Sequence, residues 1–164
     1  MITQREARLR GKAQYLVTDH GYILGDPFEH DTNGLIGTSP GVARIITGTH
    51  TGTVRITLEI HRQPPVLETD PWDEVVEVSY HTPVGRSTVY NLDWDSGFPI
   101  ATTSGRGWYR IRVHARKRDE TRDLVAHDVE EHRVCIWPGP SQEEIAYKHT
   151  DKRGAALRKA KRDK

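Results

Sequence analysis

The chain has a single cysteine, Cys135, among its 164 residues, so it cannot form an intramolecular disulfide. Apolar residues make up only 35% of the composition, and no run approaches the roughly 20 apolar residues of a membrane-spanning helix. Residues 1–12 are polar and lack the apolar stretch of a signal peptide. We therefore expect a cytoplasmic protein with no membrane segment, in which Cys135 is a small buried hydrophobe.

The chain also lacks a net charge of one sign, because 24 Lys and Arg residues face 23 Asp and Glu residues. The charges are nevertheless unevenly distributed. From Lys148 onward there are eight basic and two acidic residues, whereas residues 1–147 carry 16 basic and 21 acidic residues. An acidic body thus carries a basic tail, which is either solvated or binds an acidic partner such as nucleic acid.

Sequence motifs of common enzymes are absent. We find no nucleophile elbow, no phosphate-binding Gly-Lys-Ser/Thr loop and no dinucleotide-binding glycine pattern. The segment 127–132 contains two histidines, but their spacing fits neither zinc-protease pattern, and we interpret it as a surface charge cluster. Cys135 and His132 lie three residues apart on a predicted strand and so face opposite sides. We expect a protein that is not an enzyme and that holds no cofactor or metal.

The segment 107–116 alternates strictly between apolar and polar residues. Tyr109, Ile111, Val113 and Ala115 fall on one face, and this period of two predicts a half-buried strand. Similar segments, separated by turn residues, occupy 14–19, 42–49, 53–61, 74–81, 86–92 and 133–137. Residues 42–49 and 53–61 are joined by a short Gly-containing connection typical of a hairpin.

This pattern predicts an all-β protein, a single antiparallel β-sandwich of about seven or eight strands. We expect three parts: a flexible N-terminal segment at 1–12, the sandwich domain at 13–140, and a basic C-terminal tail at 141–164. The tail has acidic residues early and basic residues late, an order that favours a helix.

Two surfaces are candidates for binding. The outward face of strand 107–116 begins with Trp108 and presents a row of cations, which either binds an anion or is neutralised by acidic neighbours such as Glu59 or Glu77. The second candidate is a pair of acidic loops that surround Trp72 and Trp94. A tryptophan among carboxylates either anchors a basic partner or closes one end of the sandwich.

The run Gly107–Arg116 and the last strand with its aromatic-proline ending, His132–Pro138, resemble patterns of the competence protein J family. The chain is also similar to short actinobacterial proteins related to that group. The resemblance spans residues 13–140. It implies a small cytoplasmic protein that inhibits a DNA-entry nuclease by binding it. The family has no catalytic motif, so the resemblance assigns no functional residue.

The leading hypothesis is a non-catalytic cytoplasmic binding protein, an inhibitor or immunity protein of a nuclease or toxin. Its predicted partner contacts are Trp72, Asp73, Trp94 and Asp95. The alternative is a nucleic-acid-binding protein that uses the basic strand face and the tail, through Arg110, Arg112, Arg116, Lys152, Arg153, Arg158, Lys159, Lys161 and Arg162. A second alternative is a carbohydrate-binding sandwich with Trp72 and Trp108 as stacking platforms.

Overall fold

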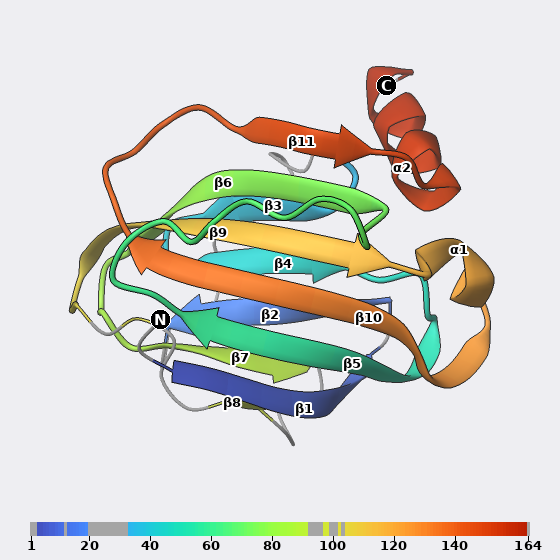
Figure 1. Cartoon of the computed structure of the whole chain (residues 1–164), viewed down its shortest axis with the longest axis horizontal. Helices are drawn as coiled ribbons and strands as arrows, with labels where there is room; N and C mark the ends of the chain where they lie inside the picture. The colour runs from blue at the N-terminus through green and yellow to red at the C-terminus, as the bar shows by residue number, and fades with distance from the viewer. Residues whose placement is uncertain are drawn as a thin grey trace.

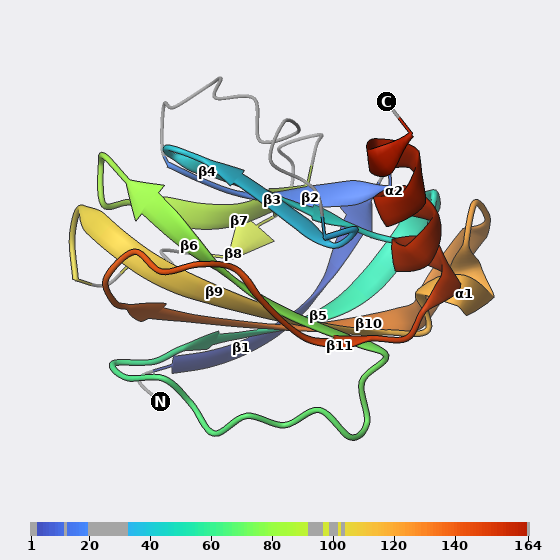
Figure 2. The same ribbon diagram turned by 90° about the horizontal axis from the view of Figure 1, so that it is seen from above.

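The structure, a computed structural model, describes residues 3–11, 13–19, 33–91, 97–98, 102 and 104–163. Two β-sheets pack face to face, and a helix near the C-terminus lies at one end of the sandwich (Figures 1 and 2). The predicted all-β sandwich is confirmed, although the described residues form eleven strands rather than seven or eight. No helix in this part of the chain is long and apolar enough to cross a membrane.

The six-stranded sheet contains, in order across the sheet, β1 (Thr3–Gly11), β5 (Thr51–Ile60), β10 (Val125–Pro138), β9 (Gly107–Arg116), β6 (Glu74–Thr82) and β11 (Ile145–His149). The five-stranded sheet contains β3 (Ile36–Ser39), β4 (Val42–Ile46), β2 (Gln14–Asp19), β7 (Ser87–Asn91) and β8 (Gly97–Phe98). The helices are α1 (Arg118–Thr121) and α2 (Lys152–Arg162). Strands β5 and β10 run parallel, and the other pairs are antiparallel.

The hydrophobic core fills the space between the two sheets. In β9 the inward residues are the four predicted by the alternation, and all four are buried: Tyr109, Ile111, Val113 and Ala115. Strand β5 contributes every second residue from Val54 to Ile60 in the same way. The central strands of the six-stranded sheet, such as β5 and β9, therefore have an inner face toward the core and an outer face that is turned away from the second sheet.

Strands that lie outside the predicted domain limits of 13 and 140 also belong to the six-stranded sheet. Residues 3–11 form β1, which pairs with β5 from Thr3 opposite Ile60 to Gly11 opposite Gly52. Past residue 140, β11 pairs with β6 and α2 follows. Residues on both sides of the predicted domain thus contribute strands to its sheet, and the three-part division stays a prediction.

The predicted hairpin is wrong, because β4 and β5 lie in different sheets. The connection between them crosses from one sheet to the other at Gly48. A Cβ atom on this glycine would lie 2.0 Å from the backbone oxygen of Arg118, so the close approach of the two segments requires glycine. Gly48 therefore marks a close approach between two backbone segments and not the turn of a β-hairpin.

Candidate functional site

The β5–β6 loop, residues 61–73, crosses the outer face of the six-stranded sheet (Figure 2). It contains no helix or strand, but side chains from three strands hold it. Nη1 of Arg112 donates to the backbone oxygen of Pro65 (3.1 Å), and Nη1 of Arg133 donates to Glu68 (2.7 Å). From β11, Nζ of Lys148 donates to the backbone oxygen of Thr69 (3.2 Å). The loop is therefore anchored along its length.

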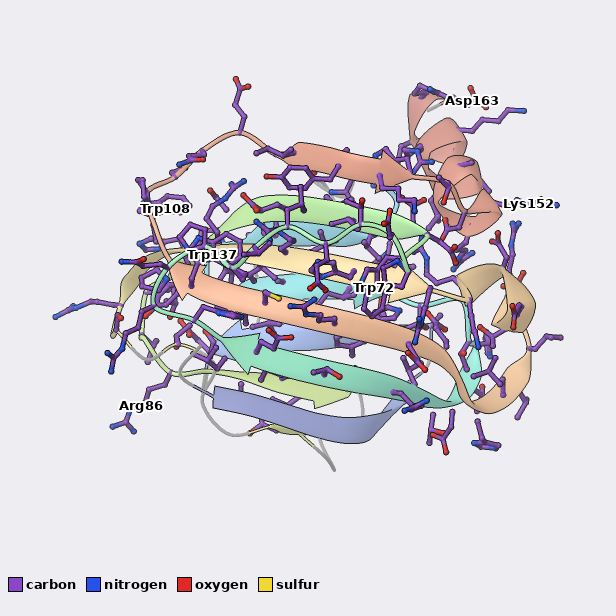
Figure 3. All side chains as sticks on the ribbon, in the orientation of Figure 1. Trp72, Arg86, Trp108, Trp137, Lys152 and Asp163 are labelled. Atoms are coloured by element: carbon purple, nitrogen blue, oxygen red, sulfur yellow. The ribbon has the colours of Figure 1, made fainter. Side chains whose placement is uncertain are left out.

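Two of the predicted partner contacts lie at the end of this loop and make contacts within the protein. The Trp72 ring lies 5.4 Å from the His114 ring, and the Arg116 guanidinium lies 5.1 Å from the Trp72 ring. Oδ2 of Asp73 accepts a hydrogen bond from the Lys117 backbone N–H (2.9 Å). Figure 3 shows Trp72 over the sheet, apart from Trp108 and Trp137. Trp72 thus covers the outer face of the sheet.

The other two predicted contacts, Trp94 and Asp95, lie outside the described residues. An exposed apolar pair that the sequence analysis did not single out lies on the β5–β6 loop. Val66 is 84% exposed and Leu67 is 40% exposed, and Glu68 and Asp70 follow them on the surface. The signal was present in the sequence, since an apolar pair directly after two prolines in a loop has no core to enter.

The predicted row of outward cations is largely buried. Glu77 binds both Arg110 (2.8 Å) and Arg112 (3.0 Å), which are 2% and 4% exposed. Glu131 pairs with Arg116 in the same way. The expected solvent-facing row is therefore wrong for Arg110 and Arg112, and the alternative of neutralisation by Glu77 is confirmed. The cause is the β5–β6 loop and β11, which cover this face.

Next to this row, three side chains with metal-ligating atoms meet under the start of the β5–β6 loop. The ligand atoms of Glu59, His61 and Cys135 all lie within 4.8 Å of one another, and all three residues are buried. Glu59 was expected to neutralise the β9 row but binds Arg133 instead. Burial and the negative charge of Glu59 raise the pKa of the Cys135 thiol to about 12, so it is not an activated nucleophile at neutral pH.

The segment 127–132 is not the surface charge cluster that was expected. His127 is exposed, but Glu130 and His132 are buried on the inner face of β10. Nε2 of His132 lies 2.7 Å from Glu130, and Nδ1 lies 2.8 Å from the Tyr15 hydroxyl. These residues form a polar connection between the sheets.

The basic tail residues are divided between structural and surface roles. Nη1 of Arg158 donates to the backbone oxygen of Asn33 (3.1 Å), and Arg153 is half-buried. The backbone N–H groups of Lys152 and Arg153 donate to Asp119 at 2.9 Å, which fixes α2 against the turn at α1. Lys161 is half-buried, and the cations of α2 that are exposed are Lys152, Lys159 and Arg162.

Trp108 borders a pocket of about 470 Å³ at the opposite end of the sandwich from α2. The ring is 47% exposed, and its edge packs against His81 at 4.9 Å between ring centroids. The carbohydrate hypothesis required Trp72 as a second stacking platform, but that ring lies beneath Arg116. Trp108 therefore has no second exposed stacking platform among the described tryptophans, which does not favour a sugar site.

No protein-family model matches the chain, and no curated protein sequence matches it. Two solved structures share the fold. "Crocagin biosynthetic gene J" has a TM-score of 0.55 at 14% identity, covering 84% of this chain and 98% of that one. ComJ from Bacillus subtilis, described as the inhibitor of the DNA-degrading activity of NucA, has a TM-score of 0.53 at 12% identity, covering 84% and 96%. The resemblance to the competence protein J fold is confirmed.

Proposed function

We propose that this chain is a non-catalytic binding protein whose partner is another protein, and that the β5–β6 loop makes the contact. The observation that carries the proposal is the exposed pair Val66 and Leu67 on a loop that the sheet holds in place. Exposed aliphatic side chains on a rigid loop lose little conformational entropy when a partner covers them. Loops on a rigid scaffold are also the usual location of binding residues.

The charge of the loop favours a cationic partner. Glu68 and Asp70 are exposed beside the apolar pair, so a basic surface would complement the loop. The similarly folded ComJ is described as an inhibitor of a DNA-degrading protein. A protein that degrades DNA needs a cationic surface for the phosphates. A nuclease or a nucleic-acid-directed toxin is therefore the partner class we propose, with inhibition by blocking its DNA-binding surface.

The test places a photo-crosslinking amino acid at Val66 in the full chain and, as a matched control, at Val84, which is 47% exposed in the β6–β7 connection. In the producing cells, position 66 should capture a protein that position 84 does not. The captured protein, once purified, should degrade nucleic acid, and added chain should suppress this activity. Val66→Asp should weaken suppression at least tenfold, because it puts a charge in the centre of the contact.

Equal capture from both positions would show that the loop is not the contact surface. A captured protein whose nuclease activity the chain does not suppress would refute the inhibitor role. Unchanged suppression by the Val66→Asp variant would remove the apolar pair from the interface. Because Val66 is almost fully exposed, this variant should fold as the parent chain does.

A further inference from the structure

The Glu59, His61 and Cys135 cluster arises from strand register. Glu59 and His61 are two residues apart at the end of β5 and so share the outer face. Cys135 on β10 is the direct partner of Glu59 in the parallel pair. The exposed fractions of the three residues are 6%, 7% and 0%. A carboxylate, an imidazole and a thiol thus converge at a place where the sheet backbone is rigid.

The hydrogen bonds around Glu59 leave its carboxylate well oriented. Oε1 accepts from Nε2 of His61 (2.9 Å) and from Nη2 of Arg133 (3.2 Å), while Oε2 accepts from Nε of Arg133. Carboxylates that bind metals in proteins are oriented by hydrogen bonds of this kind. Ligand atoms around a tetrahedral zinc lie about 3.5 Å apart. Small side-chain rotations from the present arrangement would reach that spacing.

The charges at the cluster fit a divalent cation. Arg133 binds both Glu59 and Glu68, so these three side chains together carry one net negative charge. A Cys135 thiolate would add a second negative charge, and a divalent cation would then neutralise the two negative charges at the site. Of the neighbouring ionisable side chains, Arg112 is already paired with Glu77, and burial lowers the pKa of His114 to about 4, which keeps that ring neutral.

A pocket of about 860 Å³ reaches the cluster from outside, between the β5–β6 loop and the sheet. Glu59, His61 and Arg133 line it from the sheet, and Pro64 and Glu68 line it from the loop. An ion could enter here, and water or a further ligand could complete its coordination. Zinc ions that are held by three protein ligands keep a fourth coordination position open to water or another ligand.

We propose that Glu59, His61 and Cys135 bind one divalent transition-metal ion of the zinc class. On binding, the Cys135 thiol releases its proton to solvent, the sulfur–metal bond forms, and a ring nitrogen of His61 coordinates the ion in place of its hydrogen bond to Glu59. Mixed sulfur, nitrogen and oxygen ligands suit zinc and cobalt rather than magnesium or calcium. This ligand set is not evident from the sequence, because Cys135 meets Glu59 and His61 only through the β5–β10 pairing. Val66 and Glu68 of the β5–β6 loop also line the pocket, but binding of the ion requires no partner.

The test is a titration of the chelator-treated, reduced full chain with Co²⁺, followed in the ultraviolet and visible spectrum. One equivalent should produce thiolate-to-cobalt charge-transfer absorption together with the d–d bands of a four-coordinate ion, and Zn²⁺ should remove both. Cys135→Ser should abolish the charge-transfer band, and His61→Ala should weaken binding at least tenfold. His127→Ala is the control, since this exposed histidine on β10 is outside the cluster and its loss should change nothing.

Absence of a charge-transfer band in the parent chain would overturn the proposal, whatever the variants do. So would equal Co²⁺ affinity in the parent and the His61→Ala chain, or loss of binding in His127→Ala. Circular dichroism checks that each variant is folded. If Cys135→Ser does not fold, the parent spectrum and the His61→Ala comparison still decide, because His61 follows the end of β5 and is outside the hydrophobic core.

Discussion

At the residue scale, buried polar side chains determine how the segments between strands are held. Glu130 accepts hydrogen bonds from the backbone N–H groups of Gly48 (3.0 Å) and Thr49 (2.9 Å) and from the hydroxyl of Thr121 (3.2 Å). One carboxylate thus joins the sheet crossover, α1 and β10. Although burial favours the protonated form, the hydrogen bond from His132 and the backbone hydrogen bonds lower the pKa of Glu130 to about 2.

A pH-dependent contribution to stability follows from this lowered pKa. The carboxylate stabilises the folded state fully above about pH 4.5, and the contribution is lost as the pH falls toward 2. Its size is about 3 kcal/mol. Glu130→Gln should therefore lower the free energy of unfolding by about 3 kcal/mol at pH 7, and by much less at pH 3, in urea titrations. Glu120→Gln, at an exposed site, is the control and should have no effect. An equal loss at both pH values would contradict this role.

Individual residue roles were predictable where the alternation continued and were missed where long-range packing decided them. The inward set of β9 followed from its period of two. Glu130 and His132 share the parity of Val134 and Ile136 on β10, but their charge favoured a surface position in the sequence analysis. Their interior hydrogen bonds involve residues of other strands and loops, which a single sequence cannot place.

At the element scale, the sequence predicted the strands with strong alternation and missed the strands at the sheet edges. β1 contains few apolar residues, and β11 is short and mostly exposed, so neither has a clear period of two. Charged or short strands are common at edges, where they prevent pairing with other chains. The partners of β4 and β5 were also unpredictable, because nothing local tells a hairpin from a crossover between sheets.

A buried ion pair holds the start of helix α2. Arg118 is fully buried and donates to both oxygens of Asp151 (2.7 and 2.9 Å), while Asp151 caps α2 by accepting from the Gly154 backbone N–H (2.7 Å). Burial and the proximity of Asp151 raise the pKa of Glu74 to about 8, whereas the hydrogen bond from Arg118 lowers the pKa of Asp151 despite its burial. At neutral pH the Asp151 carboxylate is therefore ionised and forms the ion pair with Arg118.

Asp151→Ala should destabilise the protein by about 3–5 kcal/mol, because the buried Arg118 loses its two hydrogen bonds to a carboxylate, with only Glu74 left at 3.9 Å, and because a helix cap is removed. The docked helix should also become accessible, so that trypsin cleaves within α2 far faster than in the parent chain. Lys159→Ala, at an exposed position of the same helix, should leave both the unfolding midpoint and the cleavage pattern at the remaining sites unchanged. A protease-resistant Asp151→Ala chain would show that α2 is held by other contacts.

At the scale of the whole molecule, the even balance of charge in the sequence is reproduced locally on the outer face of the six-stranded sheet. Glu77 and Glu131 each bridge two guanidinium groups, and Arg133 bridges two carboxylates. This face is cationic when read along β9 alone and nearly neutral in the fold. The carboxylates come from β5, β6, β10 and the β5–β6 loop, so the sequence predicted the row of cations but not the extent of its neutralisation.

The nucleic-acid hypothesis is tested by the salt dependence of binding to the whole chain. Each phosphate contact adds about −0.9 to the slope of log affinity against log salt. Nine cations in contact would give a slope of about −8, whereas the three exposed on α2, Lys152, Lys159 and Arg162, would give about −3. We expect weak duplex binding with the shallower slope in fluorescence anisotropy, and Lys159→Ala should reduce its magnitude by about one. A slope near −8 would mean that Arg110 and Arg112 leave Glu77 to reach the phosphates, and the neutral outer face would then not persist in the complex.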